Sequence, residues 1–385
     1  MRVRSRSSVI VCLVAAAVGG RVLIEAQAPP SGADLRVMLV GQALIKKDLR
    51  PIVPKSVSAA QAYLRGADVV FTNLEAAVAP PDANLQPRSP TAIAGKPDVV
   101  DCLKEMGFNI LSLANNHAAD LGQPGFATTR QVVGQKGFAF AGTGANIREA
   151  AGAGYLETRA GKVALVAMAS GAIGQLSPET WATPTRGGVN FLELREDGTL
   201  NPEQKKWNLD AVREAARQAG LVIVYQHNHY WGDRREIDGP PERETRVDRF
   251  TTPAWTERWA REVIDAGAHI YVAHGNPALH GVEIYKGRLI LYGLGNYIFQ
   301  TSLSIDRYGP LAWYSAVVDA RFTNGRVSGV RFTPLVLAMA GEAQGAPFVA
   351  QGGEAVAVLS RLADVSRPYG TTIRIDKERA EVVLK

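Results

Sequence analysis

Short, largely apolar runs alternate with amphipathic stretches along the first third of the chain. The runs at residues 35–40 and 68–71 predict buried strands, and residues 57–66 between them predict a helix. A second helix is predicted over residues 98–107 and a further strand over residues 109–113. This order indicates parallel strands covered by helices, because each parallel connection needs a crossover.

The alternation returns after a longer stretch that shows no clear period. Helices are predicted over residues 203–220 and 253–267, and strands over residues 221–225 and 269–272. The pattern then changes to paired strand runs, one pair joined at Asn324-Gly325, a strong hairpin signal. Parallel units followed by hairpins predict an α/β fold with two mixed sheets flanked by helices. The paired runs are residues 282–285 with 289–292, 313–322 with 327–336, and 371–375 with 379–384, and a helix is predicted over residues 350–363.

The N-terminus changes how the charge is interpreted. The formal net charge of +6 alone suits a protein that binds phosphate-rich partners. Residues 1–28, however, combine a basic start, an apolar run at 9–19 and a small-residue site at 26–28, which predicts a signal peptide cleaved near Ala28. Its removal leaves 39 of the 43 basic and 36 of the 37 acidic residues, a net charge of +3. We therefore expect an exported protein, periplasmic or extracellular, with no nucleic-acid partner.

Three features leave a favoured interpretation beside an alternative. The apolar run at 9–19 is shorter than the roughly 20 residues that span a bilayer, so an uncleaved anchor is the less favoured interpretation. Cys102 lies in an apolar helical pattern and is expected to be a buried structural residue rather than a nucleophile. The charged residues 234–249 are expected to form a solvated loop, with a lid over a substrate as the alternative.

Polar side chains with metal-binding chemistry follow one predicted strand after another. Imidazole nitrogen together with carboxylate and amide oxygen is the ligand set of divalent ions such as zinc, manganese or iron. Taken singly, an asparagine here can cap a helix and a histidine can be structural, but the set as a whole favours a metal site. His269 starts its strand and is excluded, because the site belongs at the carboxyl ends. The residues near those ends are Gln42, Asn73, Glu75, Asn115, Asn116, His117, His227, His229, His274 and His280.

Several of these residues lie in short motifs that occur together in a known family. Residues 73–75 (Asn-Leu-Glu), 114–117 (Ala-Asn-Asn-His), 281–288 (Gly-Val-Glu-Ile-Tyr-Lys-Gly-Arg) and 294–297 (Leu-Gly-Asn-Tyr) resemble the CapA-like proteins of poly-γ-glutamate capsule synthesis. That family belongs to the calcineurin-like metallophosphoesterase superfamily. The resemblance extends over about residues 34–300.

The resemblance implies a four-layer α-β-β-α sandwich with two mixed sheets and one or two divalent metal ions at the strand ends. Residues 34–340 would form the metallophosphatase domain, and residues 341–385 a helix and strand pair that complete it. By position, Glu75 is implied to bridge the metals, and His117 to donate a proton or to stabilise the transition state. The implied metal ligands besides Glu75 are Asn116, His227 and His274, with His229 as an alternative ligand, and Asn73 and Asn115 are the candidate substrate-binding residues.

The chain departs from the family pattern at two positions. Gln42 stands where the family has an aspartate, and a neutral amide oxygen binds a divalent cation more weakly than a carboxylate does. The family also has a histidine two or three residues after the one that matches His274, and here the nearest substitute is His280, six residues on. Both are therefore weak candidate ligands, and the site is expected to hold either two metals or one.

The expected function is that of an exported metal-dependent hydrolase or transferase that acts on an anionic polymer, poly-γ-glutamate or a related capsule polymer, or on a small phosphoester. The membrane-bound capsule-synthesis machinery is the candidate protein partner. The alternative is a non-catalytic protein that binds the polymer during its synthesis or export. Gln42 and the displaced histidine favour this alternative, whereas Glu75, Asn116 and His117 favour the enzyme.

Overall fold

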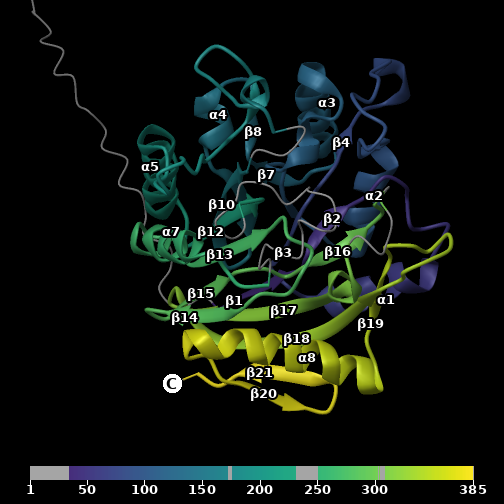
Figure 1. The fold of residues 1–385 in the computed structure, drawn as a ribbon, viewed down its shortest axis with the longest axis vertical. Coiled ribbons are helices and arrows are strands. Elements are labelled where there is room, and N and C mark those ends of the chain that lie inside the picture. Colours follow the sequence, from purple (N-terminus) through teal and green to yellow (C-terminus); the bar gives the residue numbers. More distant parts are fainter. Residues whose placement is uncertain (1–33, 172–175, 231–249, 302, 304–307, 385) are drawn as a thin grey trace, which may run out of the picture.

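The computed structural model describes residues 34–171, 176–230, 250–301, 303 and 308–384 (Figure 1). The predicted signal peptide, residues 1–28, and the whole charged stretch 234–249 lie outside the described residues. Within the described ranges, no helix is both long enough and apolar enough to cross a membrane.

The larger sheet has nine strands and combines both strand directions. Strands β1, β3, β6 and β7 run parallel in that order, whereas β17 pairs antiparallel with β1 and β18 with β17. The C-terminal strands β20 and β21 join the same sheet through β18. The sheet order is β20-β21-β18-β17-β1-β3-β6-β7, with β19 on β18. The bounds are β1 Leu35–Leu39, β3 Val69–Asn73, β6 Ile110–Ser112, β7 Ala139–Ala141, β17 Tyr314–Thr323, β18 Arg326–Leu337, β19 Pro347–Val349, β20 Ile373–Asp376 and β21 Arg379–Val382.

The second sheet has six strands in the order β14-β15-β13-β12-β10-β9 and is mixed as well. Its central strands β10, β12 and β13 are parallel, and hairpins form both edges. The prediction of two mixed sheets is confirmed. The sequence predicted no element in the stretch between the two halves, and β9 and β10 lie there. The bounds are β9 Gly154–Thr158, β10 Gly161–Ser170, β12 Leu221–Asn228, β13 Ile270–His274, β14 Val282–Tyr285 and β15 Arg288–Leu291.

Three apolar clusters place the helices relative to the two sheets. The first cluster contains inward side chains from both sheets, such as Val37, Phe71 and Leu165, so the sheets face each other across it. A second cluster joins the outer face of the larger sheet to α1 and α2, and a third joins the outer face of the smaller sheet to α5 and α7. Leu359 and Leu362 of α8 enter the cluster between the sheets. The helix bounds are α1 Pro54–Leu64, α2 Pro97–Met106, α3 Gly122–Gln135, α4 Ile147–Ala151, α5 Pro202–Gln218, α7 Ala254–Asp265 and α8 Gly352–Ser366.

Local sequence signals explain where these elements begin and end. α2 has proline in its first position and ends at Gly107, whose φ of 109° suits glycine. Asn324 and Gly325 adopt φ values of 51° and 69° between β17 and β18, as the Asn-Gly hairpin signal predicts. Cys102 is buried in α2, where burial raises the pKa of its thiol to about 12, so the prediction of a structural cysteine is confirmed.

Short elements connect the sheets around the strand ends. β2 pairs with β16, β4 with β5 and β8 with β11. β5 lies within the proline-spaced loop that connects β4 to α2, and this loop is tied to the segment after His117, because Arg88 N donates to the Asp120 carbonyl over 2.8 Å. The bounds are β2 Gln42–Leu44, β4 Ala77–Val78, β5 Ala94–Gly95, β8 Thr143–Gly144, β11 Gly188–Val189, β16 Asn296–Phe299, and the 3-10 turns η1 Pro81–Ala83, η2 Asn116–Ala119, η3 Pro178–Thr180, η5 Pro310–Trp313 and η6 Arg367–Tyr369.

Candidate metal centre

The carboxyl ends of strands from both sheets meet at one place between the sheets. From the larger sheet, β3 is followed by Glu75, and β6 is followed by η2, which begins with Asn116. From the smaller sheet, β12 carries His227, and His229 lies one residue beyond its end. Parallel β3 and β6, and parallel β12 and β13, bring these ends to one edge of each sheet, as expected for the carboxyl ends of an α/β fold.

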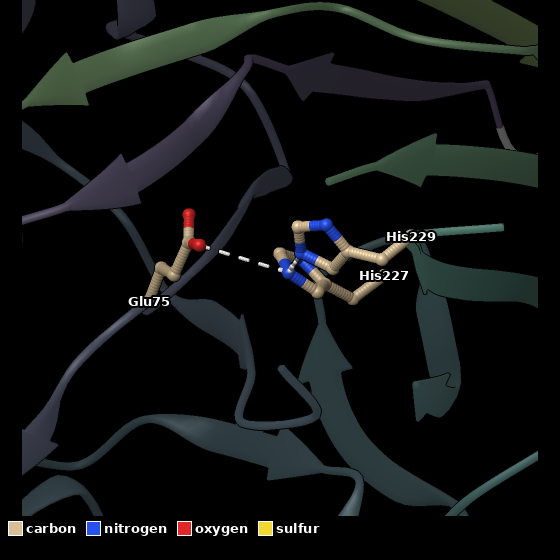
Figure 2. A group of neighbouring side chains, drawn as sticks. All are labelled: Glu75, His227 and His229. Atoms are coloured by element: carbon tan, nitrogen blue, oxygen red, sulfur yellow. Dashed lines mark hydrogen bonds and ion pairs between the residues drawn. The ribbon is translucent and has the colours of Figure 1, made fainter. Parts of the chain in front are cut away.

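Glu75, His227 and His229 form the tightest group in this centre (Figure 2). One ligand atom from each lies within 4.8 Å of the others, and all three side chains are buried. His227 Nε2 lies 2.8 Å from His229 Nε2, 2.8 Å from Asn116 Oδ1 and 3.6 Å from Glu75 Oε1. The structure thus brings together four of the residues that the sequence proposed as ligands.

Burial controls the charge of this group. It raises the pKa of Glu75 to about 8, a rise opposed by His117 and increased by Asp120. Burial also lowers the pKa of His229 to about 3 and that of His227 well below its usual range, where the neighbouring histidines add to the effect. Near neutral pH both imidazoles are therefore neutral, and the Glu75 carboxyl favours its protonated form when no cation is near.

The donor atoms of this group suit a divalent cation. Glu75 Oε2 and His229 Nδ1 have no hydrogen-bond partner, although both atoms are buried. Buried polar atoms usually have partners, so such orphaned atoms call for an explanation. Neutral imidazole nitrogens facing a carboxylate and an amide oxygen are the ligands that zinc, manganese or iron accept. The residues present therefore fit the metal that the sequence led us to expect.

Tyr225 holds His227 in place, and His274 lies beside both of them. The Tyr225 hydroxyl lies 3.2 Å from His227 Nδ1, so the second ring nitrogen has a partner that fixes the orientation of the ring. His274 ends β13 and stands opposite His227 in the parallel register. Its ring packs edge-on to Tyr225, and burial lowers its pKa to about 3, an effect that a hydrogen bond with the Val40 backbone opposes. His274 therefore lies beside the centre but outside the tight group of three.

His117 is oriented by a residue that sequence reasoning missed. His117 Nδ1 lies 2.7 Å from Asp120 Oδ2, and the Asp120 side chain is fully buried whereas that of His117 is 13% exposed. Asp120 also accepts a hydrogen bond from the backbone N–H of Ile93 in the proline-spaced loop. The Asn-His-x-x-Asp spacing places both side chains within one short turn, and this was the signal that could have identified Asp120.

The two weak candidate ligands do not join the tight group. Gln42 is hydrogen-bonded to other residues, and His280 lies elsewhere. Gln42 Nε2 donates to Asn296 Oδ1 over 2.9 Å, and its oxygen accepts from the Gly275 N–H over 3.0 Å. The oxygen proposed for a metal is thus already bound to the turn after β13. His280 is buried but lies outside the group around His227. His269 Nδ1 accepts from the Val222 N–H, which suits the structural role expected of it.

The two candidate substrate-binding residues are fully buried and bind each other. Asn115 Nδ2 donates to Asn73 Oδ1 over 3.1 Å and to the Leu74 carbonyl over 2.8 Å. Asn115 precedes η2 but its side chain makes no capping bond, so the alternative of a helix cap was wrong for it. Both asparagines tie the loop after β3 to the loop after β6, and thereby hold Glu75 near Asn116.

Comparisons with known proteins identify relatives. The model of a family described as "Bacterial capsule synthesis protein PGA_cap" matches residues 36–301. The uncharacterized protein y4sH of Sinorhizobium fredii is 28% identical over 88% of this chain and 91% of its own length. The capsule biosynthesis protein CapA of Bacillus anthracis is 26% identical over 66% of this chain and 55% of its own length. A phosphatase structure from Mycoplasma pneumoniae covers 79% of this chain and 94% of its own, with 13% identity and a TM-score of 0.46.

Proposed function

The chain belongs to the bacterial capsule synthesis protein PGA_cap family, and we propose that it is an exported metal-dependent hydrolase or transferase that acts on an anionic polymer or a phosphoester. The observation that carries this proposal is the buried group of Glu75, His227 and His229, with Asn116 on His227. The Nε2 atoms of both histidines converge beside the Glu75 carboxyl, whose Oε2 has no hydrogen-bond partner, and a divalent cation between them would bind all three side chains at once.

Glu75, Asn116, His227 and His229 would hold the first cation, and His274 is the nearest candidate for a second. When bound, a zinc, manganese or iron ion supplies Lewis acidity, which lowers the pKa of a bound water and steadies charge on a phosphoryl or acyl oxygen. The neutral imidazoles are ready to bind, because burial keeps the pKa of His227 and His229 low. Glu75 would release its proton when the cation binds.

His117 and Asp120 supply the proton transfer of the proposed reaction. Asp120 Oδ2 accepts the hydrogen bond from His117 Nδ1–H and so leaves Nε2 of the imidazole as the atom that meets the substrate. The partial exposure of His117, beside fully buried Asp120, is what a proton donor to a leaving oxygen needs. Asp120 acts as a positioning residue.

The proposed substrate class and location come from relatives and sequence. Relatives carry the names "Capsule biosynthesis protein CapA" in Bacillus anthracis and "PGA biosynthesis protein CapA" in Bacillus subtilis, which supports an anionic capsule polymer and the capsule-synthesis machinery as partner. The signal-like pattern at residues 1–28 supports export. Helices α1 and α2 outside one sheet and α5 and α7 outside the other support the four-layer sandwich.

A non-catalytic polymer-binding protein is the second candidate, and Gln42 favours it. Its amide bridges Asn296 and Gly275 instead of offering a free carboxylate to a second cation. A centre with one cation suits binding as well as slow hydrolysis.

Metal content and turnover of a chromogenic phosphodiester with manganese separate the two candidates. We expect His227→Ala to lose the metal, and His117→Ala and Asp120→Asn to keep it while turnover falls by about 10²-fold or more. Wild-type protein that holds metal, binds polymer and turns over neither phosphodiester nor polymer would establish the binding protein instead. Wild-type protein that holds no metal after reconstitution would overturn both the metal-dependent enzyme and the binding protein with one cation.

A further inference from the structure

A groove of about 790 Å³ lies on the outer face of the larger sheet and belongs to no part of the metal centre. It crosses β1, β17, β18, β21 and β20, with Tyr63 of α1 on its border. Figure 1 shows these C-terminal strands at the end of the molecule opposite α3 and α4. Five arginines and three acidic residues line the groove, an excess of two positive charges.

Part of this charge is balanced by a row that runs across the strands. In the sheet register Asp319 stands opposite Arg331, Arg331 opposite Glu381, and Glu381 opposite Arg374. Arg331 and Arg374 both form ion pairs with Glu381. The row therefore alternates in sign and needs no external partner.

Arg321 lies beside this row and is not balanced. It stands directly opposite Arg36 across β1 and β17, and like charges in that position repel each other. Arg36 is bound by Asp319 through two hydrogen bonds of 3.0 and 2.9 Å. On its other side Arg321 faces Gly329, which has no side chain to meet it. Arg379 stands opposite Asp376 across β20 and β21. Among the described residues neither Arg321 nor Arg379 forms an ion pair, and both are exposed.

We propose that this groove binds an extended polycarboxylate chain, as a second polymer site separate from the metal centre. Guanidinium groups bind carboxylates in paired hydrogen bonds, the arrangement that Arg36 already makes with Asp319. Arg321 on β17 and Arg379 on β21 lie on opposite sides of the balanced row, so both can meet carboxylates of one extended chain that crosses the strands. Three acidic residues in the groove and a single tyrosine on its border disfavour nucleic acid, which needs stronger positive charge and stacking rings.

The inference takes its polymer from the proposed function and adds a holding site to it. Arg36 lies near the start of β1, whereas the metal centre lies beyond the other end of that strand. While one segment of a polymer chain is held in the groove, another segment of the same chain could reach the metal centre. The tether would raise the effective concentration of the polymer at that centre.

The test is the binding of fluorescently labelled poly-L-glutamate, about 20 residues long, to the purified protein at low salt, measured by anisotropy. Arg321→Gln/Arg379→Gln is expected to weaken binding by about tenfold. The control Arg213→Gln/Arg217→Gln removes the same charge from the exposed side of α5 and should change binding by less than about twofold. Equal weakening by the two pairs, or none by the first, would overturn the proposal.

Two further arms separate binding in the groove from binding at the metal centre and from attraction of any polyanion. Chelator treatment and His227→Ala both disable the metal centre. Polymer binding that persists in these two samples supports the groove, even if the proposed catalysis fails. Loss of all polymer binding in those samples assigns it to the centre and rejects the groove. Single-stranded DNA of matched charge is the third probe, and DNA that binds as tightly as polyglutamate would replace the polycarboxylate by nucleic acid.

Discussion

The carboxyl group of Glu75 makes the metal-free protein sensitive to pH. Its pKa rises from 4.5 to about 8 on folding because the side chain is buried beside neutral imidazoles. Between these values the unfolded chain has released a proton that the folded chain keeps. The contribution of Glu75 to stability therefore falls as the pH rises from about 4.5 to 8, by up to roughly 1.4 kcal/mol per pH unit.

Glu75→Gln removes this pH dependence. We expect the variant to gain stability relative to the wild type as the pH increases from 5 to 8, measured by thermal unfolding in the presence of a chelator. The control Glu354→Gln changes an exposed carboxylate on α8 and should follow the wild type. Curves for Glu75→Gln and wild type that stay parallel over this range would show that the carboxyl is not held protonated.

We expect Gln42 to limit the number of cations that the proposed centre can hold. Gln42→Glu keeps the length of the side chain and adds a carboxylate at a position that is 2% exposed. We expect more metal per chain after reconstitution, and lower stability without metal, because a buried charge then lacks a counterion. Elemental analysis measures the metal content, and thermal unfolding in the presence of a chelator measures the stability without metal.

Gln300→Glu is the matched control for this substitution. Gln300 is also a largely buried glutamine, and its oxygen accepts from the N–H groups of Lys46 and Lys47 beyond the other end of β2. It should not change the metal content. A metal content unaltered by Gln42→Glu would mean that this oxygen does not face the centre.

At the scale of elements, the end of β10 controls the position of His229. Gly171 follows β10 with φ of 107°, and a Cβ added there would lie 2.5 Å from His229 Cβ. Gly161 begins the same strand with φ of 118°, and nothing lies within 4 Å of an added Cβ. The two glycines thus share backbone strain but differ in the neighbour that a methyl group meets.

Gly171→Ala should therefore displace His229, whereas Gly161→Ala should not. We expect both variants to lose stability, by about 1 kcal/mol or more through the positive φ, and only Gly171→Ala to lose metal affinity. Metal titration followed by calorimetry measures the difference. Equal affinity in the two variants would show that His229 does not bind the cation.

Elements with strong periodicity were predictable, and those without it were not. The β17–β18 hairpin was found because Asn324-Gly325 sets its turn. β10 was missed because Ala164, Ala167 and Ala169 interrupt its β-branched residues, and alanine has low strand propensity. β10 is nevertheless a strand, because it pairs with β9 on one side and β12 on the other and is buried between them. Such burial depends on the whole sheet and cannot be seen in the local sequence.

At the scale of the molecule, the C-terminal segment shares the core with the rest of the chain. Leu362 of α8 is fully buried between the sheets, whereas Val356 on the same helix is 47% exposed. Leu362→Ala should lower the free energy of unfolding by about 2–5 kcal/mol and Val356→Ala by less than about 0.5 kcal/mol. Chemical unfolding followed by both fluorescence and metal release should show one transition in each. Two separated transitions would make the C-terminal segment an independent unit.

The sequence could predict which residues gather at the candidate site, but not which atoms they contact there. Glu75, Asn116 and His227 could be grouped because each follows a predicted strand and parallel strand ends meet. The sequence could not show that Gln42 is held by Gly275, or that His280 lies apart, since these depend on how loops far apart in the chain pack together.

The centre also joins two sheets that otherwise meet through apolar faces. Glu75 and Asn116 follow strands β3 and β6 of one sheet, and His227 and His229 lie at the end of β12 of the other. A bound cation would therefore cross-link the two sheets, as a disulfide does in proteins that have one. Sliding of one sheet over the other would then be restricted only in the loaded protein. The lifetime of the protein against proteases thereby becomes a measure of how much metal its surroundings supply.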